Sequence, residues 1–228
     1  MTEFLHAPAR CLVIQQEISL YDANGPAALR AAVSGRGDVL LLGDFTDLAV
    51  RRAALALACR DCLVLAEWSE RGTVHASRRW LDEVPPTARE QLRSDLATAL
   101  LAILHYELCP RVDTPGLVAA HELLVTTSEI VDSIREDKLE RIPAAIEAGR
   151  KYGLCLLDGS LWELFQAGSI APEVALERAR DPAQLQERIE RRSRSDEGGE
   201  PPEFSPFPVR PKSPPPGLSE HKKPGAGE

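Results

Sequence analysis

The carboxylate of Asp44 is the first group in this sequence that could carry out chemistry. It follows four apolar residues and Gly43, which predicts a buried strand from Asp38 to Phe45 with Asp44 at its carboxyl end. A carboxylate in that position has the geometry of a Walker B element, where it polarises the water that attacks a nucleotide. The structural alternative is that Asp44 caps a helix over 48–59.

A phosphate-binding loop is the companion that such a carboxylate needs. The pattern G-x-x-x-x-G-K-[ST], whose backbone N–H groups and lysine hold the phosphates, does not occur among the 228 residues. Phosphoryl transfer depends on that positioning of the nucleotide. A Walker B-like strand in this sequence therefore raises the question of what it does without the loop.

Two residue pairs give further candidates. His121 and Glu122 adjoin on an apolar segment, where a hydrogen-bonded structural pair competes with a metal or acid-base site, and no third ligand is near in sequence. Cys59 and Cys62 have the CxxC spacing of a redox or zinc motif, but no second pair accompanies them. Each pair could therefore form a functional site or have only a structural role.

Composition excludes several classes of protein. The formal net charge is −8, whereas nucleic-acid binding depends on clustered Lys and Arg, so no nucleic-acid partner is expected. No apolar stretch approaches the roughly 20 residues that cross a bilayer, so we expect no direct membrane insertion and a cytoplasmic protein. An odd number of cysteines, five, predicts reduced thiols.

Strands and helices are predicted to alternate in the first part of the chain, and helices dominate after it. Runs rich in Val, Ile and Leu indicate strands over 10–18, 38–45, 62–68 and 116–125. Thr87 and Glu90 form a capping box that predicts a helix to about Leu108. Shorter helices are expected over 130–139, 143–151 and 156–167, and Pro172 and Pro182 each fit the first position of one more. An α/β sheet followed by helices is the expected order.

The C-terminal segment has a different composition. Half of the 18 prolines lie at or beyond Pro201, and apolar periodicity is nearly absent there. Such a segment buries too little surface to offset its ordering entropy, so we expect residues 193–228 to be a disordered, Pro-rich tail.

The order of the segments resembles one known family. The run AALRAAVSGRGDVLLLGDFTDL is similar to the Walker B region of the type IV pilus retraction ATPases (twitching motility, PilT-type), which are related to type II secretion ATPases. The run RVDTPGLVAAHELLVTTSEIVDSIRED resembles the family's stretch with an AHE element and a helix ending in I-R-E. RIPAAIEAGRKYGLCLLDGSLWELFQAGSI resembles its closing helices. The resemblance covers the C-terminal half of the motor domain only.

Departures from the family pattern fall where ATP would bind. The family's Walker B strand ends in Gly-Glu, whereas Asp44 is one methylene shorter, which sets its carboxylate back by about 1.5 Å. Ser69 stands where the family has a nucleotide-facing His, and Glu67 and Glu70 would present an acidic pair to any phosphate. Gln16 and Leu20 align with two family arginines. We expect the Walker B residues Asp38, Gly43 and Asp44 to be vestigial.

The resemblance implies an incomplete RecA-like (P-loop NTPase-type) sheet. We expect a partial α/β core over 1–128, a helical region over 129–192 and the tail over 193–228. Met1 falls after the family positions of the phosphate loop and aspartate box, so two strands would lose partners, and unpaired apolar edges invite pairing with another chain. Three explanations stay open. Another subunit completes the sheet, the domain is remodelled into a compact form, or the true start of the reading frame lies upstream.

Two functions from different classes fit this reading. In the first, the chain is a degenerate member of the family that needs no cofactor and acts as an interaction or regulatory module. Its partners would be pilus motor subunits or its own copies, through Arg135, Glu136, His121 and Glu122, at the inner-membrane base of the pilus. In the second, it is an ATPase half that uses ATP and Mg when a subunit carrying the phosphate loop completes it, or the truncated gene model of an active ATPase. A thiol or metal protein using the CxxC pair is a third.

Overall fold

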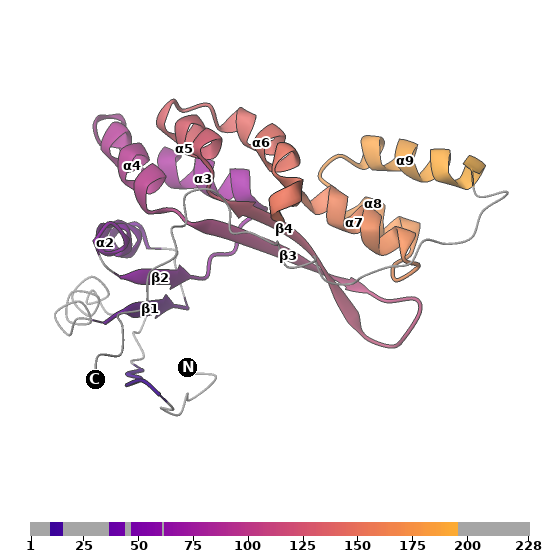
Figure 1. The fold of residues 1–228 in the computed structure, drawn as a ribbon, viewed down its shortest axis with the longest axis horizontal. Helices are drawn as coiled ribbons and strands as arrows, with labels where there is room; N and C mark the ends of the chain where they lie inside the picture. Colours follow the sequence, from indigo (N-terminus) through magenta and orange to yellow (C-terminus); the bar gives the residue numbers. More distant parts are fainter. Residues whose placement is uncertain (1–9, 16–36, 44–46, 61, 196–228) are drawn as a thin grey trace, which may run out of the picture. The chain divides into compact units, whose positions relative to one another are not determined.

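The structure is a computed structural model, and it describes residues 10–15, 37–43, 47–60 and 62–195. Contacts divide the chain into two compact units, Met1–Ser69 and Glu70–Glu228 (Figure 1). Each unit is described by itself. The predicted boundaries at 128 and 192 remain predictions.

The first unit contains a strand, helix and strand in the order of a parallel crossover. β1 (Val39–Leu42) pairs in parallel with β2 (Leu63–Ala66), and α2 (Leu48–Ala58) connects them. The strands expected from these two apolar runs are confirmed. The helix over 48–59 is also present, but its cap is Asp47, whose Oδ1 accepts from the Val50 N–H at 2.8 Å. The prediction that Asp44 caps it was wrong, because the helix starts one residue after Asp47.

One face of the β1–β2 pair is bare. Val39 lies opposite Leu63 and Leu41 opposite Leu65, so these four side chains share a face, and all four are exposed. Parallel strands are normally covered on both faces. Within its described residues, the first unit thus forms a two-stranded parallel sheet with one exposed face.

The second unit is built on a long hairpin. β3 (Ala102–Pro110) pairs antiparallel with β4 (Leu117–Val125) over nine residues each. The hairpin closes where the Arg111 N–H donates to the Gly116 carbonyl at 3.1 Å, and Gly116 takes a φ of 132° that favours glycine. The strand expected over 116–125 is confirmed.

Helices of the second unit lie on one side of this hairpin (Figure 1). The prolines expected to open two helices do so in α8 and α9. The elements are α3 (Thr73–Asp82), α4 (Pro86–Ala99), α5 (Ser128–Arg135), the 3-10 helix η1 (Leu139–Arg141), α6 (Ile142–Ala148), the 3-10 helix η2 (Arg150–Tyr152), α7 (Leu157–Gln166), α8 (Pro172–Arg178) and α9 (Pro182–Ser195).

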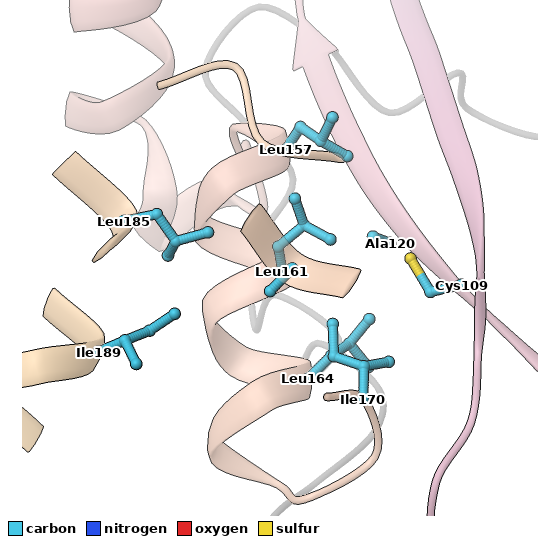
Figure 2. Close-up of a cluster of buried hydrophobic side chains, with 9 residues drawn as sticks. Cys109, Ala120, Leu157, Leu161, Leu164, Ile170, Leu185 and Ile189 are labelled. Carbon is cyan, nitrogen blue, oxygen red and sulfur yellow. The ribbon is translucent and has the colours of Figure 1, made fainter. Parts of the chain in front are cut away.

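The hairpin and the last three helices share a hydrophobic core (Figure 2). Leu157 and Leu161 of α7 are fully buried between Cys109 and Ala120 of the hairpin on one side and Leu185 of α9 on the other. Leu164, Ile170, Ala175 and Ile189 complete the cluster. Burial of this apolar surface is what holds α7, α8 and α9 on the hairpin.

The helix predicted from Thr87 to Leu108 was wrong in its second half. α4 ends at Ala99, and 102–110 is strand β3. The residues of β3 alternate in burial, and this apolar run is extended because it pairs with β4. The capping box was also wrong, because α4 begins at Pro86 with Pro85 as its N-cap and no side-chain cap.

Two further differences concern the ends of elements. The strand expected over 10–18 is absent from its described part, since 10–15 has no regular structure, and 16–18 lie outside the described residues. Helix α3 had no sequence prediction, because its apolar residues are few and polar ones dominate it. None of the described helices combines the length and apolar content needed to cross a bilayer.

Candidate functional site

The Walker B-like residues do not form one site in the described structure. Gly43 follows the carboxyl end of β1, whereas Asp38 precedes its amino end, so a four-residue strand separates them by roughly 15 Å. The Asp38 carbonyl accepts from the Leu63 N–H at 2.9 Å, which begins the β1–β2 ladder. Asp44, Gln16 and Leu20 lie outside the described residues.

The segment after β2 is where the family resemblance places a nucleotide-facing histidine. Its backbone continues the ladder, because the Glu67 N–H donates to the Leu42 carbonyl at 2.9 Å. The ring of Trp68 lies 4.6 Å from the guanidinium carbon of Arg51, a cation-π distance. Ser69 is exposed. This segment therefore offers a hydroxyl and an aromatic face in place of an imidazole.

Glu70 is held by helix α3. Only 5% of its side chain is exposed, its Oε2 lies 3.1 Å from His75 Nδ1, and its Oε1 pairs with Arg79. Arg79 in turn donates to Glu83 at 2.9 Å. The predicted acidic pair facing a phosphate is therefore wrong for Glu70, because its charge is neutralised within the second unit.

Glu122 of the AHE element caps helix α3. Its buried Oε1 accepts from the Thr73 N–H at 2.6 Å, and the N-cap residue Gly72 supplies no side-chain cap. A carboxylate at a helix N-terminus satisfies an orphan donor and complements the helix dipole. Glu122 thus links β4 to α3, which precedes it in the chain by 49 residues.

His121 points the other way. It pairs with Tyr106 across the hairpin, whereas Glu122 pairs with His105, so the two neighbours lie on opposite faces. The Ser160 Oγ accepts from the His121 N–H at 3.1 Å and lies 3.3 Å from its Nδ1. His121 and Glu122 therefore cannot act together on one bound group.

A cluster of polar groups, here called the polar junction, surrounds Gly72 on the face of the hairpin where Glu122 is buried. Its φ is 110°, and a Cβ there would lie 3.0 Å from both Arg180 Nη2 and Glu122 Oε1. Arg180 Nη2 lies 2.9 Å from His105 Nε2. Asp158 accepts from the backbone N–H of Arg180 at 2.7 Å. The junction fixes the turn between α8 and α9 against the hairpin and the start of α3.

Sequence reasoning missed this junction. Arg180, His105 and Thr73 follow no ligand spacing, and they meet only when the hairpin forms. Asp158 lies in the run that resembles the family's closing helices, and it also accepts from the Asp181 N–H at 2.8 Å. The junction stabilises packing and leaves no open acid-base pair among the residues named here.

The I-R-E element ends helix α5. Ile134 is fully buried and anchors the helix, whereas Arg135 and Glu136 are exposed. Lys138 donates to Glu136 at 2.6 Å, and this hydrogen bond lowers the pKa of that carboxyl. Within the described ranges, the side chain of Arg135 makes no hydrogen bond or ion pair. The guanidinium of Arg135 is therefore the charged group of the I-R-E element that a ligand could contact, because Glu136 is paired with Lys138.

The cysteines are dispersed. Cys59 is the C-cap of α2, and Cys62 directly precedes β2. Burial raises the pKa of Cys109 and raises that of Cys155 to about 11, so both thiols stay protonated at neutral pH. In the parts of the chain that the structure describes, no three His, Cys, Asp or Glu residues gather as metal ligands would.

Three curated proteins align with most of this chain. The type IV pilus retraction ATPase PilT of Pseudomonas aeruginosa is 33% identical over 180 residues, which are 79% of this chain and 52% of that protein. A twitching motility protein of Neisseria gonorrhoeae is 31% identical over 179 residues, 78% of this chain and 48% of that protein. The chain belongs to the type IV pilus retraction ATPase family.

The third relative of this family is the uncharacterized protein YggR of Escherichia coli. It is 38% identical over 153 residues, which are 67% of this chain and 46% of that protein. The chain thus spans about half the length of the curated relatives that it matches. No family model matches the chain.

Solved structures confirm the fold class. The crystal structure of the pilus retraction motor PilT with bound ADP matches with a TM-score of 0.69 and 28% identity, covering 77% of this chain and 49% of that one. The ATPase DotB of Legionella pneumophila matches with a TM-score of 0.59 at 22% identity, which supports the fold alone. The predicted partial RecA-like fold of the retraction ATPase family is therefore confirmed.

Proposed function

We propose that this chain acts as an interaction or regulatory module on a pilus motor and does not hydrolyse ATP by itself. One observation carries the proposal. At the place where the resemblance puts a nucleotide-facing histidine, the chain has Ser69 followed by Glu70, whose carboxylate pairs with Arg79 and lies 3.1 Å from His75 Nδ1. Phosphoryl transfer depends on positioned groups and electrostatic stabilisation, and this segment supplies neither.

The end of α5 is the surface that we propose for docking. Ile134 fixes the helix end in the core, and Glu136 is engaged by Lys138. Arg135 therefore presents a planar fork of donors to solvent, a group that binds a carboxylate in a bidentate manner. The partner is an acidic surface on a pilus motor subunit or on another copy of the chain. We place this activity in the cytoplasm, at the inner-membrane base of the pilus.

A second candidate function is an ATPase half that is completed by a segment carrying the phosphate-binding loop. The bare face of β1–β2, formed by Val39, Leu41, Leu63 and Leu65, favours it. The faces of a parallel sheet are normally covered by helices, and a helix of the completing segment would cover this one. ATP and Mg would then be bound chiefly by the completing segment.

The first test is ATP hydrolysis by the isolated protein. We expect no turnover above background, because positioned phosphate-binding groups provide most of the catalysis. Steady-state phosphate release with Mg and ATP measures it. Turnover on the order of 1 per second that Asp44→Ala abolishes would reject the module. Turnover that appears only when a segment carrying the phosphate-binding loop is added would support the ATPase half.

The second test is the substitution Arg135→Glu. We expect it to weaken capture of a pilus motor subunit by about 30-fold, or about 2 kcal/mol, since reversing one partner of a desolvated charge pair leaves the other without compensation. A titrated pull-down with purified motor subunit measures this affinity.

The control for this substitution is Arg52→Glu, which makes the same charge change at an exposed position of α2. It should leave the affinity unchanged. Equal losses in both variants would mean that net charge rather than Arg135 governs the association. If Arg135→Glu leaves the capture unaffected, the end of α5 is not part of the interface.

A further inference from the structure

His105 lies in the polar junction, and its partner there can only donate hydrogen bonds. The Nε2 atom of His105 lies 2.9 Å from Arg180 Nη2, and 15% of the histidine side chain is exposed. A guanidinium carries five N–H donors and no acceptor, so Nε2 must accept this hydrogen bond. The proton of the ring is then on Nδ1, and the structure describes His105 in its neutral form.

A carboxylate lies beside the same ring nitrogen. Glu107 Oε1 is 3.4 Å from His105 Nε2, and Glu107 Oε2 accepts from Arg178 Nη1 at 3.1 Å. The first of these distances is too long for a normal hydrogen bond, as expected while Nε2 has no proton to donate. A protonated Nε2 is a positively charged donor, which attracts Glu107 and repels the guanidinium of Arg180. One nitrogen therefore has two alternative partners, and its protonation decides between them.

The other carboxylates of the polar junction are engaged by backbone groups. Glu122 lies opposite His105 on β4, and its Oε1 accepts from the first N–H of helix α3 at 2.6 Å. Asp158, at the start of α7, accepts from two backbone N–H groups of the turn between α8 and α9 at 2.7 and 2.8 Å. Glu107 and Arg180 are therefore the charged groups whose contacts with the ring change when it gains a proton.

The side chain of Arg180 joins the start of helix α9 to the hairpin. The next residue, Asp181, accepts from the Gln184 N–H at 3.0 Å through its Oδ1 and from the Leu185 N–H at 3.1 Å through its carbonyl. Leu185 is itself buried in the core between the hairpin and the last helices. Loss of the contact between Arg180 and His105 therefore loosens α9 at its first turn.

We propose that His105 is a pH-sensitive switch that controls how firmly the turn between α8 and α9 is held on the hairpin. When the ring is neutral, Arg180 donates to it and the turn is docked. When the ring gains a proton, Nε2 donates to Glu107, the guanidinium of Arg180 withdraws, and the turn opens more often. Histidine is the side chain whose charge ordinarily changes within the physiological range of pH. All of these groups belong to the second unit, and none lies at the end of α5, so the switch is independent of the proposed docking surface.

Hydrogen exchange of the full chain at about pH 7.5 and about pH 5.5 tests the switch, because in this interval histidines change charge while most carboxylates stay ionised. The open turn binds the proton more readily than the docked turn, so opening increases as the pH falls. After correction for the direct effect of pH on exchange, we expect the protection of the Gln184 and Leu185 amides to fall about fivefold, since one hydrogen bond to a charged group is lost. The Val131 amide of α5, in the same unit, is the internal reference and should keep its protection.

Two substitutions of histidine on the hairpin assign the effect to one residue. His105→Gln should remove the pH dependence and keep the protection near its value at the higher pH, because an amide oxygen accepts from Arg180 at every pH. His121→Gln is the matched control, since it removes a histidine on the opposite face of the same hairpin and should leave the pH dependence in place. If His105→Gln does not fold, Arg180→Met is read instead, and it should show low protection at both pH values.

Three results overturn the inference. Equal protection of the Gln184 and Leu185 amides at the two pH values shows that the turn does not respond to protonation. A pH dependence that persists in His105→Gln, or in Arg180→Met, shows that another group controls the turn. A pH dependence that is lost in His121→Gln but kept in His105→Gln assigns the switch to the other histidine of the hairpin.

Discussion

Replacing Leu161 by alanine is expected to lower the free energy of unfolding by about 2–5 kcal/mol. Leu161 is fully buried at the centre of the cluster between the hairpin and α9 (Figure 2). Its removal loses the transfer free energy of three carbon atoms and leaves a cavity that the neighbouring helices fill only in part. Urea denaturation followed by the helical signal in circular dichroism measures the change.

The matched control is Leu12→Ala, the same deletion at a position that is 83% exposed. Its effect should lie within about 0.5 kcal/mol of zero. Comparable losses at both positions would mean that the cluster in Figure 2 does not contribute the stability that its burial implies.

Replacing Glu122 by alanine is expected to cost about 2–4 kcal/mol, the largest effect of any polar residue described here. The change removes a charged acceptor and leaves the buried Thr73 N–H without a partner at the start of α3. Glu122→Gln keeps an amide oxygen in nearly the same place, so it should cost about half as much. Thermal and urea unfolding of both variants would show this order.

Two substitutions separate capping from other causes. Gly72→Ala should be destabilising by more than 1 kcal/mol, because its φ of 110° disfavours a side chain and a Cβ would crowd Arg180 and Glu122. Glu140→Ala, at an exposed acidic residue of the same unit, should be nearly neutral. If Glu122→Ala were as mild as Glu140→Ala, the AHE carboxylate would not be the cap of α3.

These expectations give the AHE element a physical role. In this chain its glutamate holds β4 to α3, and its histidine lies on the opposite face of the hairpin. Neither residue is placed for acid-base chemistry with the other.

Local signals in the sequence determined several elements of this protein. The apolar runs of β1, β2 and β4 are short and bounded by polar or turn residues, which is enough to predict strands, although no residue of β1 or β2 is buried. Pro172 and Pro182 opened α8 and α9, because proline lacks the N–H that the first helical position leaves unpaired. The order of these signals also revealed the family.

Tertiary structure decided what local signals could not. Residues 102–110 are equally apolar as a helix or a strand, and only β4, paired along its whole length, makes them a strand. Glu122 met Thr73, and Arg180 met His105, across 49 and 75 residues, so no spacing rule could join them.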